Sequence, residues 1–229
     1  MHQRFSVASP GGRGLPIDVV TYGPDVPGED SLRLLGNVEG TRVLDLGCGA
    51  GHNAIALARQ GAKVIGVDAS SDQVAEARAA CEREDVRIEL HHAPLAELAF
   101  IRADTIDAVL SVWGLVDVED IDRVFRQVDR VLRPEHPLVL ALPHPAYAMV
   151  DPDDPDRRVR RSYWETAAVD GIVPRTIGTL FMALGRANFR VDTVLEPQPA
   201  DNGPRSGAWH DHMRYVPSTL IIRARKQGI

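Results

Sequence analysis

A glycine-rich segment near residue 47 carries the residue types most able to bind a charged ligand. Gly47, Gly49 and Gly51 follow one another at every second position, and the acid Asp45 stands two positions before the first. Glycines let the backbone turn sharply and approach a ligand, and a helix that begins there offers N–H groups and a partial positive charge to an anion. A carboxylate at Asp45 suits an ammonium group. The segment therefore favours a ligand with an amine beside a carboxylate; the alternative is a tight turn without a ligand.

The spacing of these glycines separates the segment from a dinucleotide-binding turn. The glycines stand at 47, 49 and 51, whereas the dinucleotide fingerprint is G-x-G-x-x-G. The carboxylate of Asp45 would also repel a pyrophosphate. An NAD(P)-dependent oxidoreductase is therefore only the second hypothesis. Cys48 is interpreted as a small turn residue rather than a nucleophile, and Asn53 as an early residue of the following helix.

A second acid follows the next strand-like run, 63–67. An ionised carboxylate at Asp68 can accept hydrogen bonds from both hydroxyls of a ribose, and bonds to ionised acceptors are the stronger ones. The alternative is that Asp68 caps the following helix, but Ser70 and Ser71 are available for that role. Asp68, with Ala69 beside it, is therefore predicted to bind a sugar.

Strand-like and helix-like segments alternate along the chain, which predicts an α/β fold. Apolar runs predict strands at 42–46, 63–67, 86–90, 106–111, 138–142, 189–195 and 215–225. Helical spacing and caps predict helices at 31–35, 53–60, 70–83, 119–133 and 174–187. This order predicts a doubly wound, mostly parallel seven-stranded sheet with helices on both faces and an antiparallel last strand. Ligands bind such sheets at the carboxyl ends of the strands, where Asp45 and Asp68 stand.

The whole chain, 1–229, is predicted to form a single domain. Residues 1–30 are rich in glycine and proline and are expected to form an N-terminal arm or lid. Residues 144–173 show no clear periodicity and are expected to be an insertion that covers a pocket.

Composition and charge exclude several classes of partner. The net charge of −6 and the pI of about 5.7 give no basic field, which argues against nucleic acid. No apolar run is long enough to span a bilayer, and the two cysteines suggest no disulfide framework. We therefore expect a cytoplasmic protein with no membrane partner, as a monomer or a homodimer.

The segment VLDLGCGAGHNAIALA, residues 43–58, resembles the first motif of class I S-adenosylmethionine-dependent methyltransferases. It is close to the form found in the small-molecule, ubiquinone/menaquinone-methyltransferase-like branch, and the resemblance extends from Tyr22 to the C-terminus. It implies a Rossmann-like methyltransferase fold, S-adenosyl-L-methionine as cofactor and S-adenosyl-L-homocysteine as product. The implied acceptor is an O, N or C atom of a small molecule. A non-catalytic module that binds S-adenosylmethionine is a third hypothesis.

The resemblance also implies positions around the cofactor. Pro94 stands where the family often has an acid for the adenine, so the Leu95 N–H and apolar contacts are expected to replace it, with His92 or Glu97 as further candidates. Tyr22 lies near the cofactor in related enzymes. The cofactor set is predicted to be Tyr22, Asp45, Gly47, Cys48, Gly49, Gly51, Asn53, Asp68, Ala69, Pro94, Leu95, Ser111, Val112 and Trp113.

The segment after the fourth strand, Ser111-Val112-Trp113, lies beside the cofactor in the family and opens into the acceptor pocket. An indole at Trp113 can face the sulfonium, and a cation over an aromatic face gains about 0.5–2 kcal/mol. The alternative is that Trp113 is a packed core aromatic.

The acceptor side is predicted to follow the fifth strand. His144 stands between two prolines, and a side chain with a pKa near neutrality can act as a general base. The alternative is a structural histidine bonded to the backbone. Apolar lining is expected from Tyr147, Met149, Tyr163 and Trp164, and Arg160 or Arg161 is expected to hold an anionic acceptor. The predicted substrate set is Trp113, His144, Tyr147, Arg161 and Tyr163.

Two histidine pairs are further candidates for metal binding: His91 and His92, more simply interpreted as a polar strand end, and His210 and His212 near the C-terminus. The second pair lies in a loop rich in glycine, serine and proline, and a single short pair is a weak metal motif. No metal is therefore expected.

Overall fold

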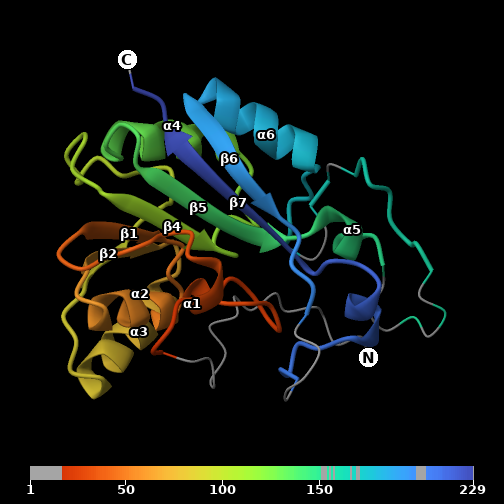
Figure 1. The fold of residues 1–229 in the computed structure, drawn as a ribbon, viewed down its shortest axis with the longest axis horizontal. Helices are drawn as coiled ribbons and strands as arrows, with labels where there is room; N and C mark the ends of the chain where they lie inside the picture. The colour runs from red at the N-terminus through yellow and green to blue at the C-terminus, as the bar shows by residue number, and fades with distance from the viewer. Residues whose placement is uncertain are drawn as a thin grey trace.

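The computed structural model describes residues 17–150, 154, 156, 158–165, 167–168, 171–199 and 205–228, so parts of the predicted arm and insertion lie outside the described residues. A seven-stranded sheet has the order β3-β2-β1-β4-β5-β7-β6 (Figure 1). The strands are β1 (Arg42–Leu46), β2 (Lys63–Asp68), β3 (Glu89–His92), β4 (Ala108–Val112), β5 (Pro137–Pro143), β6 (Phe189–Leu195) and β7 (Thr219–Lys226). The helices are α1 (Glu29–Leu32), α2 (His52–Arg59), α3 (Ser71–Arg83), α4 (Ile121–Val131), α5 (Pro145–Ala148) and α6 (Ile177–Arg186), with a 3₁₀ helix η1 (Asp211–Arg214).

The pairing of the strands confirms the predicted fold. Parallel pairs join β1 to β2 and β4, β2 to β3, and β4 to β5. The last strand, β7, runs antiparallel to both β5 and β6. The sequence therefore predicted the mostly parallel sheet and its antiparallel last strand correctly.

Several strand boundaries differ from the prediction, and local hydrogen bonds explain why. The third strand starts at Glu89 rather than 86, because the Val86 N–H donates to Cys81 O and closes helix α3. The fourth starts at Ala108 because Ile106 forms an isolated bridge with Leu132 at the end of α4. The last begins at Thr219 because the N–H groups of Tyr215 and Val216 donate to His212 O and close η1 instead of joining the sheet.

Two apolar clusters fill the two faces of the sheet. One cluster joins the strands to α4 and α6, through residues such as Phe125 and Leu184. The other joins them to the arm, the turn after α1 and helix α2, through Val20, Leu34 and Leu57. Figure 1 shows α1, α2 and α3 on one side of the sheet and α4 and α6 on the other.

The strand order places a topological switch point between β1 and β4. The chain runs outward from β1 through β2 to β3, then crosses back to β4 on the other side of β1. In such sheets the crevice at the switch point binds ligands. The arrowheads of β4 and β5 point to one edge of the sheet, and α5 and the chain after it lie beyond that edge (Figure 1).

A buried carboxylate fixes the N-terminal arm. Glu29 is 8% exposed and accepts hydrogen bonds from the Tyr22 hydroxyl and from the backbone N–H groups of Leu34, Leu35 and Gly36. The four donors satisfy both of its oxygens, so this acid serves the fold.

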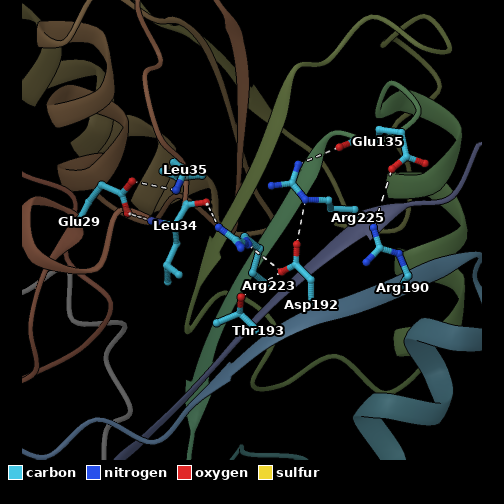
Figure 2. A network of polar contacts seen from close by, with 9 residues as sticks. All are labelled: Glu29, Leu34, Leu35, Glu135, Arg190, Asp192, Thr193, Arg223 and Arg225. Carbon is cyan, nitrogen blue, oxygen red and sulfur yellow. Dashed lines mark hydrogen bonds and ion pairs between the residues drawn. The ribbon is translucent and has the colours of Figure 1, made fainter.

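A second polar network holds the edge strand β6 against β7. Asp192 accepts from Arg223 Nε at 2.7 Å and from Arg225 Nε at 2.8 Å. Arg223 also donates to Leu34 O, and Figure 2 shows how this joins the Asp192 network to that of Glu29.

In the described part of the chain, no helix is long and apolar enough to cross a membrane.

Candidate functional site

The turn after β1 requires glycine for steric reasons. Gly47, Gly49 and Gly51 all have positive φ, at 76°, 53° and 86°. A Cβ built on Gly47 would lie 2.4 Å from the Cα of Gly114, so the backbones after β1 and β4 are in direct contact. The N–H groups of Gly47 and Cys48 both donate to Val67 O, at 2.8 and 3.1 Å. The three predicted glycines therefore form a compact turn at the switch point, and Gly51 is the N-cap of α2.

Asp45 lies under this turn with an incomplete set of partners. Its side chain is on the strand itself, the residue is 2% exposed, and Oδ2 has no hydrogen-bond partner among the described residues. Burial raises the pKa of this carboxyl to about 7, the charge of Asp68 adds to the rise, and a backbone N–H from Ala54 opposes it. A buried unpaired polar atom costs free energy. A cationic donor placed against Oδ2 would remove that cost.

Asp68 stands at the carboxyl end of β2, next to β1. Its Oδ2 accepts from the Gly49 N–H at 2.8 Å and its Oδ1 from the Ser70 N–H at 2.9 Å. Ser70, and not Asp68, is the N-cap of α3, since its hydroxyl accepts from Gln73 N. Each carboxylate oxygen of Asp68 has a further lone pair that can accept a hydroxyl. Ala69 beside it is exposed.

The loops after β3 and β4 complete the edge of the crevice. Pro94 is exposed, whereas the Leu95 side chain is buried in the apolar cluster. The Ser111 hydroxyl donates to Leu46 O at 2.6 Å and so links β4 to β1, and Val112 next to it is buried. These residues lie at the carboxyl ends of β3 and β4, on either side of β2 and β1.

Trp113 has the most unusual backbone at this edge. Its φ is 57°, a region that bulky residues rarely adopt and that costs on the order of 1–3 kcal/mol. The indole Nε1 is buried and has no partner among the described residues. A Cβ built on Gly23 of the arm would lie 3.3 Å from Nε1, so the arm packs closely against the ring. Strain and an unpaired donor at one residue indicate a binding position.

Two predicted cofactor residues direct their polar atoms to protein groups. The Asn53 side chain accepts from Thr21 N at 2.9 Å and donates to Thr21 O at 3.0 Å, which fastens the arm to α2. Tyr22 is completely buried, and its hydroxyl donates to Glu29. Burial and the adjacent Glu29 raise the pKa of Tyr22 well above its usual range. Asn53 therefore holds the arm to α2, and Tyr22 holds it to Glu29.

His144 is held on both ring nitrogens. It is 5% exposed; Nδ1 accepts from Ala146 N at 3.0 Å and caps α5, and Nε2 lies 2.7 Å from Glu196 Oε1. Because Nδ1 is an acceptor here, Nε2 carries the proton and donates it to Glu196. Neither nitrogen presents a lone pair to a substrate in this geometry. A base role for His144 therefore requires one of these bonds to open.

A pocket lies at the carboxyl end of β5, beneath the segment that follows α5. It contains about 680 Å³ of atom-free space, part of it open to solvent. Arg161 and Tyr163 line it, as predicted for the acceptor side, whereas Trp113, His144 and Tyr147 do not. Tyr147 is buried instead against His212, with ring centroids 4.6 Å apart, and burial raises its pKa to about 12. The remaining lining is mainly apolar: Val116, Leu142, Pro143, Pro145, Ala148, Met149, Ile172, Val173, Pro174 and Leu180.

Two residues at this edge were missed from the sequence. Glu196, the partner of His144, directly follows β6, and the rule that ligand-side residues follow strand ends would have singled it out. Arg175, which lines the pocket, directly precedes the N-cap Thr176 of α6, and no motif marks it. Of the described residues, no three His, Cys, Asp or Glu side chains group as metal ligands. His210 and His212 stack with centroids 5.7 Å apart.

Comparison with known proteins gives consistent results. A methyltransferase domain family matches residues 43–135. An uncharacterised protein of Haemophilus influenzae is 27% identical, over 85% of each chain. The ubiquinone biosynthesis O-methyltransferase of Bordetella avium is 35% identical, but the match covers 44% of this chain and only 42% of that protein.

Solved structures resemble the chain over most of its length. An S-adenosylmethionine-dependent methyltransferase of Mesorhizobium loti is 29% identical, covers 84% of this chain and 94% of its own, and has a TM-score of 0.68. A protein of Listeria monocytogenes assigned to the same class is 25% identical, covers 86% and 94%, and has a TM-score of 0.71. The matched domain and these solved structures support a class I S-adenosylmethionine-dependent methyltransferase with S-adenosylmethionine as its cofactor.

Proposed function

We propose that this enzyme transfers the methyl group of S-adenosylmethionine to an O, N or C atom of a small molecule bound in the pocket at the end of β5. The observation that carries this proposal is the position of that pocket, at the same edge of the sheet as the glycine turn and Asp45. The likeness to a ubiquinone biosynthesis O-methyltransferase supports a small organic acceptor. The net charge of −6 gives no support to a nucleic-acid acceptor.

The residues at the switch point fit the amino-acid end of the cofactor. The unpaired Oδ2 of Asp45 is suited to its ammonium group, and the N-terminus of α2 at Gly51 is suited to its carboxylate. The close contact between Gly47 and Gly114 keeps side chains out of this space. Cys48 and Gly49 complete the same turn.

The nucleoside is proposed to lie along the neighbouring loops. Asp68 has lone pairs left for the ribose hydroxyls after its bonds to Gly49 and Ser70. Ala69, Pro94 and Leu95 would contact the adenine. When bound, S-adenosylmethionine supplies a methyl group already activated on a sulfonium, and Trp113 is proposed to offer that cation an aromatic face.

The protein's main task is then to align the acceptor with this methyl group. Positioning alone can supply roughly 7–11 kcal/mol of the barrier, whereas a general base contributes about 10²–10⁴-fold. Neither ring nitrogen of His144 faces the pocket freely. If His144 is nevertheless the base, His144→Ala will lower turnover by about 10²–10⁴-fold; unchanged turnover at every pH would reject that role.

The acceptor can be found with methyl-labelled S-adenosylmethionine. The purified enzyme is incubated with fractionated cell extract, and the label is followed into metabolite, protein and nucleic-acid fractions. We expect one metabolite to gain the label. Labelling of protein or RNA alone would overturn the small-molecule proposal, while tight binding of NAD(H) and none of S-adenosylhomocysteine would overturn the cofactor site itself.

A further inference from the structure

Arg175 is a cation in the pocket wall whose partners among the described residues are all backbone carbonyl groups. Its Nη1 donates to Leu115 O at 3.3 Å and Val173 O at 3.2 Å, and its Nη2 donates to Val118 O. These bonds join the start of α6 to the loop after β4. They also leave two of the five guanidinium N–H groups without a partner in the described part of the chain.

No carboxylate forms an ion pair with Arg175 among the described residues. Arg158 and Arg160, by contrast, share Asp154 as their anion. Asp117 is the acid whose charge is felt at Arg175, but it is exposed and lies outside ion-pair distance. Burial lowers the pKa of the guanidinium and Asp117 opposes that effect. Arg175 is half-buried, and a charge taken partly out of water is normally paired, so among the described residues this cation lacks an anion.

Helix α6 adds positive potential at the same wall. It has 10 residues and starts directly after Arg175, with Thr176 as its N-cap. Leu180, in its first turn, lines the pocket, so the positive end of the helix dipole is next to the pocket. Arg161 and Glu165 also line the pocket and carry opposite charges, which largely offset one another. The balance at this wall is therefore positive, in a pocket whose lining is mainly apolar.

We infer that the pocket binds an apolar organic carboxylate, with its hydrocarbon or aromatic body against Leu142, Met149 and Leu180 and its carboxylate against Arg175. A planar carboxylate matches the two remaining N–H groups of a guanidinium. This inference rests on the proposed function, because it identifies the class of small-molecule acceptor. It also assigns Arg175 a specificity role toward that acceptor.

The test compares two probes of nearly the same shape and different charge, phenylacetate and phenylacetamide. Each is titrated into the isotope-labelled full chain, saturated with S-adenosylhomocysteine, and followed by NMR. We expect phenylacetate to bind roughly tenfold more tightly, the effect of one charge-assisted bond, with shifts at Leu142, Met149 and Leu180. Equal binding of the two probes by the wild-type protein would overturn the inference, as would shifts confined to other residues.

Two variants separate the effect of the Arg175 charge on binding from the effect of losing hydrogen bonds between an arginine and backbone carbonyls. Arg175→Gln should bind both probes equally. Arg130→Gln is the matched control, because Arg130 also donates to backbone carbonyls, of Leu98 and Ile101, and does not line the pocket. It should keep the preference for phenylacetate. A preference retained by Arg175→Gln contradicts the inference, whereas failure of S-adenosylhomocysteine to bind the wild type contradicts the proposed function instead.

Discussion

Two buried acids, Glu29 and Asp45, differ in their hydrogen-bond partners, and this difference distinguishes an acid that stabilises the fold from one that is proposed to bind a ligand. Both are less than a tenth exposed. Glu29 receives four protein donors, one hydroxyl and three backbone N–H groups. Asp45 keeps one oxygen that has no hydrogen-bond partner in the part of the chain that the structure describes. A satisfied buried acid stabilises the native state, whereas an unsatisfied one costs stability and is retained where a ligand completes it.

The largest effect expected from this comparison is on stability, in Glu29→Ala. The substitution leaves the Tyr22 hydroxyl and three backbone N–H groups without their acceptor. The hydroxyl and the Leu34 N–H are buried, and a buried group left without a partner costs about 1–3 kcal/mol. We expect a loss of about 3 kcal/mol or more in the free energy of unfolding, measured by urea denaturation. Glu39→Ala, at an exposed glutamate nearby, should stay within about 0.5 kcal/mol of wild type. Equal midpoints for Glu29→Ala and wild type would contradict the structural role of Glu29.

Asp45→Asn, unlike Glu29→Ala, should weaken ligand binding without lowering stability. The amide keeps the size of the side chain but removes a charge that is costly to bury, so the unliganded protein should be as stable as wild type or more stable. S-adenosylhomocysteine should bind roughly 10–100-fold more weakly, because a charge-assisted bond to its ammonium is worth about 1.5–3 kcal/mol. Calorimetric titration and a thermal melt measure the two effects. A variant that is less stable and binds as well as wild type would place Asp45 with Glu29 among the structural acids.

Because the pKa of Asp45 is raised, its role should also appear as a pH dependence of stability and of ligand affinity. In the unliganded protein this pKa is about 7, against 3.8 for an ordinary Asp, so its contribution to stability is complete below pH 3.8 and is lost as pH rises through 7. A bound ammonium favours the carboxylate, so binding must release a proton when pH is below 7. Affinity for S-adenosylhomocysteine should then fall by up to about tenfold per pH unit below neutrality. Asp45→Asn should lose this dependence; an identical pH profile in the variant would assign the titration to another group.

Glu29 and Asp45 also differ in how well their roles could be predicted from the sequence. The glycine turn, Asp45 and Asp68 are local patterns at strand ends, so their positions in the fold followed from the alternation of strands and helices. Glu29 lies in a segment rich in glycine and proline that is predicted to be an irregular arm, and nothing local indicates that its carboxylate collects four donors. The bond between His144 and Glu196 joins residues 52 positions apart.

Backbone strain was equally invisible from the sequence. The positive φ of Trp113 depends on the contact between the turns after β1 and β4. The carbonyl groups that hold Arg175 come mainly from the loop after β4, about 60 residues away in the chain. Strand order sets these contacts, and local patterns do not encode the pairing of particular side chains.

The smallest effect on stability is expected at Asp192, an acid nearer the surface whose carboxylate oxygens have hydrogen-bond donors. Its carboxyl is partly desolvated, but hydrogen bonds from Arg223, Arg225 and Thr193 outweigh that effect and lower its pKa. The side chains of the acid and the two arginines are 16%, 23% and 34% exposed, so solvent screens the pair and Asp192→Asn should cost only about 1 kcal/mol at pH 7.

The sign of its pH dependence is opposite to that of Asp45. A lowered pKa gives stability that is present above the ordinary pKa of an Asp and is lost as pH falls through the lowered value. The difference between wild type and Asp192→Asn in urea denaturation should therefore shrink toward zero at strongly acidic pH, while affinity for S-adenosylhomocysteine stays unchanged at pH 7. A difference that persists in acid would mean that Asp192 acts through packing rather than charge, and satisfied acids in this fold would then divide into two kinds.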